Sequence, residues 1–266
     1  MATKTLNRPL TIGLLAATLL LVKGNALAWG KTGHRITGAI AELHLSGYAR
    51  AQIALILGNE TLAEASIWPD FMRSNPSQFW QVTAGPWHYV TVPPGKNYEE
   101  TGAPPQGDAV TALNRFTHIL QDPDASLENK QLSLRFLIHI IGDLHQPLHA
   151  GNGKDRGGND FGVSYAGQRT NLHWVWDEGL IASEKLSFTE WVDLLEPQIT
   201  PERVVSWWDS NPQTWIAESA ALRDNIYPEE RDLRWAYSYQ HIDTVRTQLS
   251  KAGIRTAAYL NNLFSP

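Results

Sequence analysis

The sequence of 266 residues contains no cysteine. Disulfide scaffolds, thiolate zinc fingers, iron–sulfur clusters and cysteine nucleophiles are therefore excluded, because each requires a sulfur ligand or nucleophile. Any bound metal must take nitrogen and oxygen ligands. The chain also lacks an excess of positive charge, since 22 basic residues stand against 27 acidic ones and the formal net charge is −5. This balance argues against binding of nucleic acid through a broad basic surface, but it does not exclude phosphate binding by a metal.

Long apolar runs are also scarce, and the prominent one lies near the amino end. Lys4 and Arg8 precede an apolar run from Leu10 to Val22, and Ala26-Leu27-Ala28 follows it as a small-x-small cleavage signal. The run is short for a membrane span, which needs roughly 20 apolar residues. We therefore predict that residues 1–28 are a secretory signal peptide; an uncleaved membrane anchor is the alternative.

Cleavage before Trp29 would leave residues 29–266 as one domain in the periplasm or outside the cell. It would remove three basic residues and no acidic one, which leaves 19 basic against 27 acidic residues and a net charge of −8. A cysteine-free exported chain must be stabilised by packing, by metal or by both. The sequence offers eleven tryptophans for packing, and we expect Trp207, Trp208, Trp215 and Trp235 to lie in the core.

Helical periodicity dominates the rest of the chain. Apolar residues at helical spacing predict one helix after Thr32, with Ile36, Ala39, Ile40 and Leu43 on one face, and another with Leu113, Phe116, Ile119 and Leu120. Residues 127–144 are apolar around much of the circumference, which is typical of a buried central helix. Residues 201–222 and 232–263 are predicted to form two more helices. We expect the second of these to bury Trp235, Tyr239, Ile242, Val245 and Leu249.

Loops and one short hairpin complete the predicted fold. Residues 93–107 and 150–160 are rich in proline and glycine and are predicted to be loops. Val163-Ser164-Tyr165 is predicted to be a strand that turns at Ala166-Gly167. The predicted fold class is therefore mostly α, a single bundle-like helical domain with a small β-hairpin.

Two His/Asp pairs stand out against this helical background. His139 and Asp143 are four residues apart in the buried helix, so both side chains leave the same face one turn apart. His173 and Asp177 repeat the spacing. A charged Asp143 among isoleucines and leucines would cost several kcal/mol to bury unless a cation neutralises it. The pairs therefore indicate a metal site, and a metal-free buried His–Asp hydrogen bond is the alternative.

Four further residues are candidate ligands or partners of this site. His149 follows Pro147, which should end the buried helix and let the chain turn back. Asp70 follows Trp68-Pro69, a rigid start for a helical turn. His88 and His34 lie near tryptophans. Each of Asp70, His88 and His34 taken alone also fits an ordinary core or surface role.

Taken together, these residues resemble a known family. The match consists of Trp29-Gly30 and His34, Trp68-Pro69-Asp70, Trp87-His88-Tyr89, His139-x3-Asp143-x-His145-Gln146-Pro147-x-His149, Gly157-Gly158-Asn159-Asp160, and His173-x3-Asp177, in that order. This series resembles the zinc-dependent type I nucleases, which prefer single strands and have a trinuclear zinc site on the phospholipase C/nuclease fold. The missing cysteines depart from the disulfide-bonded plant and fungal members.

The resemblance implies three zinc ions and their ligands. The first would be held by Asp70, His88, His139 and one oxygen of Asp143. The second would be held by the other oxygen of Asp143, His34, and the free amine and carbonyl oxygen of Trp29. The third would be held by His149, His173 and Asp177. Zinc accepts neutral imidazole and carboxylate ligands. The amine of Trp29 becomes free only if the chain is cut before it.

The implied reaction is hydrolysis of a phosphate ester, since two zinc ions joined by a carboxylate are the two-metal arrangement used for this chemistry. Asp70 would orient or deprotonate the attacking water. Arg73 is the candidate that stabilises negative charge on the phosphate, although it could equally be a helix-surface cation. The products would carry a 5′-phosphate, and 3′-nucleotidase activity stays open. His145 would hold a ligand carboxylate or a neighbouring backbone group.

The resemblance also implies a nucleobase pocket. Tyr89 would stack on a base, Asn159 or Asp160 would hydrogen-bond the base edge, and Gly158 would allow close approach of the backbone. Because a base must be unstacked to enter, single-stranded DNA and RNA and nucleotides are the expected substrates. Ordinary packing of Tyr89 is the alternative.

Two other functions remain open at this point. A zinc phospholipase C shares the helical plan, but its last ligand pair ends in Glu where this chain has Asp177, and its first histidine lies farther from the amino-terminal tryptophan than His34 does. A periplasmic zinc-binding protein without catalysis would lack a phosphate-positioning arginine and a substrate cleft. We expect a monomer with no membrane association and no protein partner.

Overall fold

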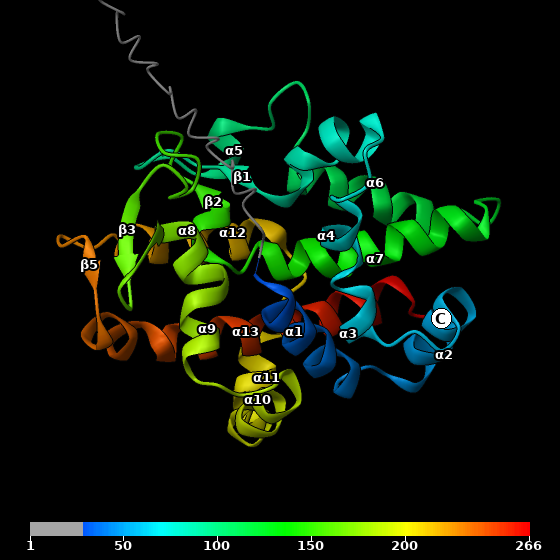
Figure 1. Cartoon of the computed structure of the whole chain (residues 1–266). Coiled ribbons are helices and arrows are strands. Elements are labelled where there is room, and N and C mark those ends of the chain that lie inside the picture. Colours follow the sequence, from blue (N-terminus) through cyan, green and yellow to red (C-terminus); the bar gives the residue numbers. More distant parts are fainter. Residues whose placement is uncertain (1–28) are drawn as a thin grey trace, which may run out of the picture.

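The computed structural model describes residues 29–266, so the predicted signal peptide lies outside the described residues. Helices make up most of this part of the chain (Figure 1). The longer helices are α1 (Lys31–Leu43), α2 (Gly47–Leu57), α6 (Ala109–Gln121), α7 (Leu127–Asp143), α10 (Phe188–Leu195), α11 (Pro201–Trp207), α12 (Pro212–Arg223) and α13 (Trp235–Leu263).

Short elements connect them. The short helices are α3 (Leu62–Ala65), α4 (Trp68–Met72), α5 (Tyr98–Thr101), α8 (Leu172–Trp174) and α9 (Leu180–Ser183). The π-helical turns are η1 (Phe79–Thr83) and η4 (Val175–Gly179), and the 3₁₀ turns are η2 (Gly85–His88), η3 (Pro147–His149) and η5 (Glu196–Gln198). The strands are β1 (Val90–Thr91), β2 (Ala150–Gly151), β3 (Gly162–Tyr165), β4 (Gln168–Asn171) and β5 (Asp232–Leu233).

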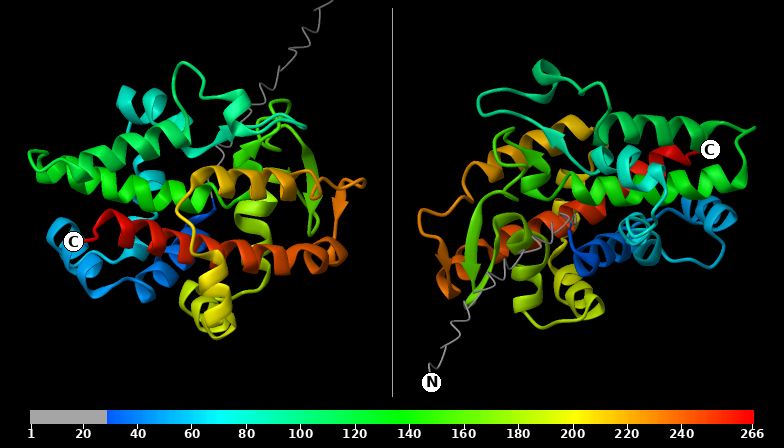
Figure 2. Two further views of the ribbon diagram at one scale, coloured as in Figure 1. Left: turned by 180° about the vertical axis from the view of Figure 1, so that it is seen from behind. Right: turned by 45° about the horizontal axis from the view of Figure 1, so that its top comes forward.

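Helix α7 crosses the middle of the molecule. It packs against α6 on one side and against α1 and α13 on the other, and α13 runs across the width of the fold (Figures 1 and 2). Ser126 caps the start of α7 by accepting a hydrogen bond from Asn129 N–H. From Phe136 to Asp143 every residue of α7 is buried, so its second half forms the centre of the fold, as predicted.

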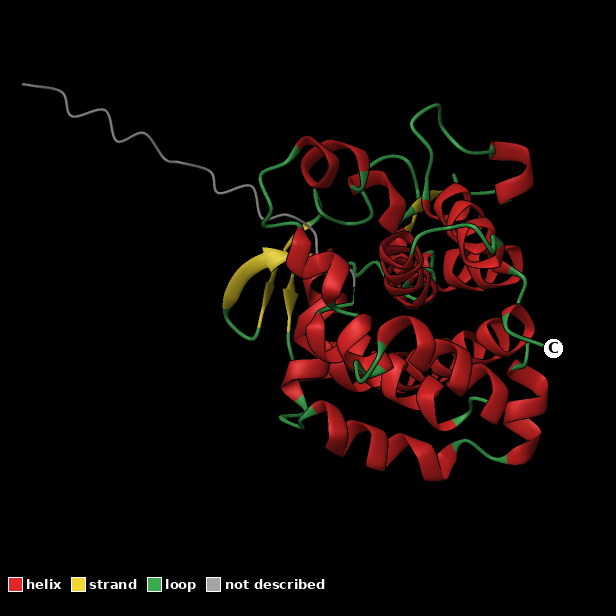
Figure 3. Ribbon diagram, turned by 90° about the vertical axis from the view of Figure 1, so that its right-hand side faces the viewer, coloured by secondary structure: helices red, strands yellow, loops and turns green. Residues whose placement is uncertain are grey.

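The predicted mostly helical fold with a small hairpin is confirmed. Strands β3 and β4 pair antiparallel and turn at Ala166-Gly167, and β5 joins β3 in parallel. These strands lie to one side of the helices (Figure 3). A second, two-stranded sheet pairs β1 with β2 in parallel, Val90 opposite Ala150. Within residues 29–266, no helix has the length and apolar character needed to cross a membrane.

The prediction of one helix over residues 201–222 is wrong, because the chain forms α11 and α12 instead. Proline has no N–H to donate and its ring clashes with the preceding turn, so a helix cannot run through Pro212 unbroken. Asn211 instead caps a new helix by accepting a hydrogen bond from Gln213 N–H. The predicted loop at 93–107 likewise contains a short helix, α5, which Asn97 and Glu100 cap reciprocally.

The predicted apolar face of the last helix is partly wrong. Val245 and Leu249 are buried, but Trp235 is 80% exposed and Tyr239 is 87% exposed. Tyr237 takes the buried position because its hydroxyl donates a 2.7 Å hydrogen bond to the carbonyl of Ile226. Among the tryptophans expected in the core, Trp215 is fully buried, whereas Trp208 and Trp235 are exposed. Leu43, expected on the buried face of the first helix, is also exposed.

The apolar core consists of two clusters. One surrounds α6 and the second half of α7 and includes Phe116, Phe136 and Trp215. The other surrounds η4 and α10 and includes Trp29, Trp176 and Trp191. The buried histidines and aspartates described next come from elements of both clusters, so packing of the two clusters brings them together.

Candidate metal centre

The two predicted His/Asp pairs form as expected from their spacing. In α7, His139 Nε2 lies 3.2 Å from Asp143 Oδ2, and both side chains are fully buried. In the turn from α8 into η4, His173 Nε2 lies 3.2 Å from Asp177 Oδ2. Segment η4 is a π-helical turn, a feature found frequently at functional sites. Each pair becomes part of a larger group.

Asp143 lies between three histidines from separate parts of the chain. Its Oδ1 is 3.2 Å from His34 Nε2, and its Oδ2 is 3.1 Å from His88 Nδ1 and 3.2 Å from His139 Nε2. His34 comes from α1 and stacks on the ring of His139 at 3.9 Å. His88 comes from η2. The two oxygens of one carboxylate therefore face two different sets of imidazole nitrogens.

Three groups of side chains could each hold a cation. Within each group the possible ligand atoms all lie within 4.8 Å of one another, and every member is buried: His34 with His139 and Asp143; Asp70 with His88 and His139; and His149 with His173 and Asp177. Together they contain the predicted ligands other than Trp29, and the third group has the predicted members. The first two are divided differently from the prediction, because His139 belongs to both of them and Asp143 only to the one with His34. No other such group occurs in residues 29–266.

Backbone hydrogen bonds fix how three of the imidazoles are oriented. The Nδ1–H groups of His139, His149 and His173 each donate a 2.6 Å hydrogen bond to a carbonyl oxygen, of Ser66, His88 and Gly157 respectively. A carbonyl oxygen can only accept, so in each ring Nδ1 carries a hydrogen and Nε2 is the nitrogen that faces the group. This is the arrangement in which proteins orient metal-binding histidines.

The strand pair β1–β2 brings two of the groups together. His88 lies two residues before β1 and His149 immediately before β2, and the two strands pair in parallel at Val90 and Ala150. Arg223, buried on α12, reinforces the pair by donating from Nη1 to the carbonyls of Val92 and Ala150.

Several atoms of the groups have no hydrogen-bond partner although they are buried. These atoms are His34 Nε2, both carboxylate oxygens of Asp70, Asp143 Oδ1 and His149 Nε2. Buried polar atoms are otherwise nearly always paired. Carboxylate oxygens and imidazole nitrogens that share one buried space can bind a cation. Zinc is a cation that takes such nitrogen and oxygen ligands.

The electrostatics of the groups lead to the same conclusion. Burial raises the pKa of the Asp143 carboxyl to about 7 and that of Asp177 to about 6. Burial also lowers the pKa of His34, His88 and His149 well below the ordinary histidine value. These three imidazoles are therefore neutral at pH 7, which is the form that binds a metal. His139 is the exception: burial lowers its pKa, but the charges of Asp143 and Asp70 outweigh burial and raise it to about 9.

Trp29 lies beside the same centre. Its side chain is fully buried, and the next residue, Gly30, donates a 2.9 Å backbone hydrogen bond to the carbonyl of Asp177. Helix α1, which carries His34, begins directly after Gly30. The backbone of Trp29 is thereby held next to the turn that carries a candidate ligand.

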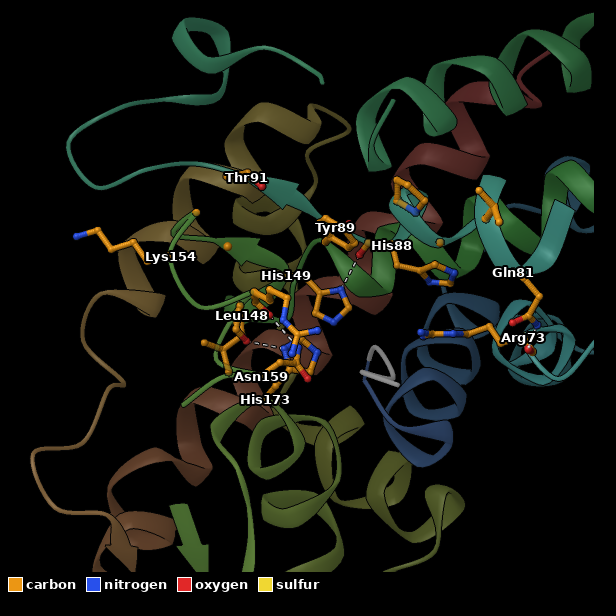
Figure 4. Close-up of a pocket in the computed structure, with 17 residues that line it drawn as sticks. Arg73, Gln81, His88, Tyr89, Thr91, Leu148, His149, Lys154, Asn159 and His173 are labelled. Carbon is orange, nitrogen blue, oxygen red and sulfur yellow. Dashed lines mark hydrogen bonds between the residues drawn. The ribbon is translucent and has the colours of Figure 1, made fainter. Parts of the chain in front are cut away.

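A pocket of about 590 Å³ opens over the centre (Figure 4). His88, His149 and His173 form part of its wall, and Arg73 lies near them with its Nη1 3.6 Å from Asp70 Oδ1. Tyr89, which is 46% exposed, and Asn159 also line it. The formally charged residues in its lining are all basic, Arg73, Lys154 and Arg156, and none of the acidic residues of the described chain contributes. The pocket lining is thus basic on an acidic protein, although Arg73 lies near Asp70 and Arg156 pairs with Asp160.

Two residues expected in the base pocket do not line it. Asp160 forms a bidentate ion pair with Arg156, with N–O distances of 2.6 to 3.1 Å. Gly158 is not part of the lining; its N–H donates to Asp155 Oδ1 and its carbonyl accepts from Phe161 N–H. Its glycine neighbour Gly157 contributes to the lining instead.

Gln146 and His145 lie among the buried residues next to the candidate ligands. The amide of Gln146 donates a 2.5 Å hydrogen bond to Asp177 Oδ1. His145 contacts no ligand carboxylate: its Nδ1 donates to the Ile141 carbonyl and its Nε2 accepts from Arg255. The only sequence signal for Gln146 was its place inside the histidine-rich motif.

Comparison with known proteins gives a consistent result. Residues 29–265 match the model of the family described as S1/P1 Nuclease. Nuclease S1 of Aspergillus oryzae is 28% identical, over 97% of this chain and 99% of the relative. Endonuclease 3 of Arabidopsis thaliana is 30% identical over 92% of each chain. Nuclease P1 of Penicillium citrinum is 28% identical, over 88% of this chain and 97% of the relative.

Proposed function

The chain belongs to the S1/P1 nuclease family, and we propose that its buried His/Asp centre holds three zinc ions and cleaves single-stranded DNA and RNA to 5′-phosphorylated products. It is a nuclease, a hydrolase of phosphodiester bonds. The proposal concerns which residues do this work, on which substrates, and in which compartment.

The observation that carries the proposal is the Asp143 carboxylate. One of its oxygens faces His34 and the other faces His88 and His139, at 3.1 to 3.2 Å. Such a carboxylate suits two neighbouring ions better than one. The proposed ligand sets are Asp70, His88, His139 and Asp143 for the first ion; Asp143, His34 and the amine and carbonyl of Trp29 for the second; and His149, His173 and Asp177 for the third.

When bound, zinc ions lower the pKa of water so that it becomes a nucleophile, and they stabilise negative charge on phosphate oxygens. The chain's own groups would do the rest. Asp70 is buried and its oxygens lack hydrogen-bond partners, which suits a group that orients the attacking water and takes its proton. Arg73, beside Asp70 and on the wall of the pocket, would stabilise the phosphate.

The pocket supports a single-stranded substrate. Tyr89 offers an exposed ring on which a base could stack, a contact worth roughly 1–3 kcal/mol for any base. Asn159 could hydrogen-bond the base edge, and a base can reach either group only when it is unstacked. Gly158 would shape the loop, and Asp160 would act through Arg156, its ion-pair partner.

We also propose that residues 1–28 are removed as a signal peptide, so that residues 29–266 work as a secreted or periplasmic monomer without membrane or protein partners. Cleavage before Trp29 would supply the free amine that the second ion requires.

A substrate panel tests the function. The zinc-loaded chain beginning at Trp29 is incubated with single- and double-stranded DNA, RNA, a 3′-mononucleotide and a short-chain phosphatidylcholine, and product ends are identified by mass spectrometry. We expect cleavage of single strands with 5′-phosphate ends. Cleavage of the lipid alone would identify a phospholipase C, and loading of zinc without any hydrolysis would identify a zinc-binding protein; either result would overturn the proposal.

A further inference from the structure

Gln146 is a buried amide next to the candidate metal centre. Its side chain is wholly buried, in the short link between α7 and η3. Its Oε1 accepts a 2.5 Å hydrogen bond from Leu148 N–H, and its Nε2 donates a 2.5 Å hydrogen bond to Asp177 Oδ1. Both ends of the amide are therefore engaged.

These two contacts fix which way the amide points. The backbone N–H of Leu148 can only donate, so the end of Gln146 that faces it must be the oxygen. The NH₂ group then has to face Asp177. A hydrogen bond to a carboxylate is roughly twice as strong as one between neutral groups, so the amide holds Asp177 firmly.

The same contact engages one oxygen of Asp177 and leaves the other oxygen to face a metal ion. Oδ1 is occupied by Gln146, and Oδ2 lies 3.2 Å from His173 Nε2. Asp143 differs, because its two oxygens face His34 on one side and His88 with His139 on the other.

The backbone around Gln146 is itself held in place from two helices. Ser219 on α12 donates to the carbonyl of Leu144 at 2.7 Å, and Gln248 on α13 donates to the carbonyl of His145 at 2.8 Å. The N–H of Gln146 bonds the carbonyl of Asp143 at 2.9 Å. One anchored turn thus follows directly on Asp143, the proposed ligand of two ions, and carries the amide that holds the carboxylate of the third.

We propose that Gln146 is a positioning residue that orients Asp177 as a one-oxygen ligand and thereby sets the affinity of the third ion. This inference rests on the ligand sets proposed above. Groups that orient a ligand typically account for about 10–100-fold in metal affinity, so loss of the amide N–H should weaken one ion by that factor and leave the other two bound.

The test compares Gln146→Met with Gln248→Met. Both substitutions remove a buried amide that contacts the same turn, but only the first removes a contact to a candidate ligand. Zinc content is measured by plasma mass spectrometry during titration with a chelator, and thermal unfolding is followed in parallel. Gln146→Asn is a second variant in case methionine does not pack, because its shorter side chain should not reach Asp177.

We expect wild type and Gln248→Met to release their third ion at the same chelator concentration, and Gln146→Met and Gln146→Asn to release it about 10–100-fold more readily. Adding His173→Ala to Gln146→Met should then lower zinc content no further than His173→Ala alone. Equal release from Gln146→Met and Gln248→Met would overturn the role of Gln146. Wild-type protein that binds fewer than three ions would instead contradict the proposed ligand sets.

Discussion

Gly157→Ala is predicted to damage both the fold and the third ligand group. Gly157 has a positive φ of 63°, which L-residues other than glycine rarely adopt. A Cβ at this position would overlap sterically with the carbonyl oxygen of Leu148. This oxygen belongs to the backbone and cannot rotate away as a side chain could. Its own carbonyl accepts the 2.6 Å hydrogen bond from His173 Nδ1. The substitution must therefore move backbone that orients a candidate ligand.

The magnitude follows from two contributions. A left-handed conformation costs an alanine roughly 1–2 kcal/mol, and relieving an overlap in a packed region costs typically about 1–3 kcal/mol. The free energy of unfolding should thus fall by about 2–5 kcal/mol. In a domain of this size each kcal/mol lowers Tm by roughly 2–4 °C, so a decrease on the order of 10 °C is expected. Zinc affinity of the third group should fall by about 10–100-fold.

Gly167→Ala is the matched control. Gly167 also has a positive φ, 82°, but a Cβ there meets nothing within 4 Å, and it lies in the hairpin turn away from the pocket. The free energy of unfolding of Gly167→Ala should fall only by the cost of the left-handed conformation, about 1–2 kcal/mol. Its zinc content should stay at the wild-type value. Differential scanning fluorimetry at a fixed zinc excess and chelator titration measure the two effects. Equal Tm and equal zinc release in the two variants would refute the reasoning.

Three further predictions concern charge. Asp143→Asn should lose two ions and lower single-strand hydrolysis on the order of 1,000-fold, because stabilisation worth several kcal/mol is removed; full zinc content in that variant would contradict the shared carboxylate. Arg73→Ala should lower kcat by about 100-fold or more while zinc content stays at the wild-type value, and an unchanged kcat would assign Arg73 to the surface. Partial burial raises the pKa of Glu218, but hydrogen bonds from Arg255 and Lys251 outweigh it and lower the pKa to about 2. Because a depressed carboxyl pKa stabilises the fold above the unfolded-state value, Glu218→Gln should cost roughly 1–2 kcal/mol at pH 7 after allowance for solvent screening. Urea unfolding should show this difference shrinking as the pH falls from about 4.5 towards 2, and a difference that is independent of pH would contradict it.

The sequence predicted the helices and the two His/Asp pairs well, because both depend on local spacing. Residues four apart on a helix face the same way, so His139 and Asp143 could be paired before any fold was known. The apolar second half of α7 likewise predicted its burial. Asp70 and His88 have no such local signal, and only the family resemblance connected them with the pairs.

The predictions from sequence failed where contacts between distant parts of the chain determine which side chains are buried. Trp235 and Tyr239 continue the spacing of Val245 and Leu249, yet the buried face at this end of α13 is the one that carries Tyr237. The hydroxyl of Tyr237 donates to the carbonyl of Ile226 and accepts from Trp176 Nε1. With both hydrogen bonds made, Tyr237 occupies the buried position that the spacing had predicted for Trp235 and Tyr239. Gln146 was not predicted for the same reason, since its partner Asp177 is 31 residues away.

The basic lining of the pocket in an acidic chain affects how the association of the protein with a nucleic acid strand depends on salt. A polyanionic strand approaching from a distance meets residues 29–266 with a net charge of −8, or about −2 once three zinc ions are bound. The resulting repulsion extends about 30 Å at 0.01 M ionic strength but only about 10 Å at 0.1 M. Attraction to Arg73, Lys154 and the proposed zinc ions acts at close range and weakens only at higher salt. We therefore expect the association rate with single-stranded DNA to rise and then fall as ionic strength increases.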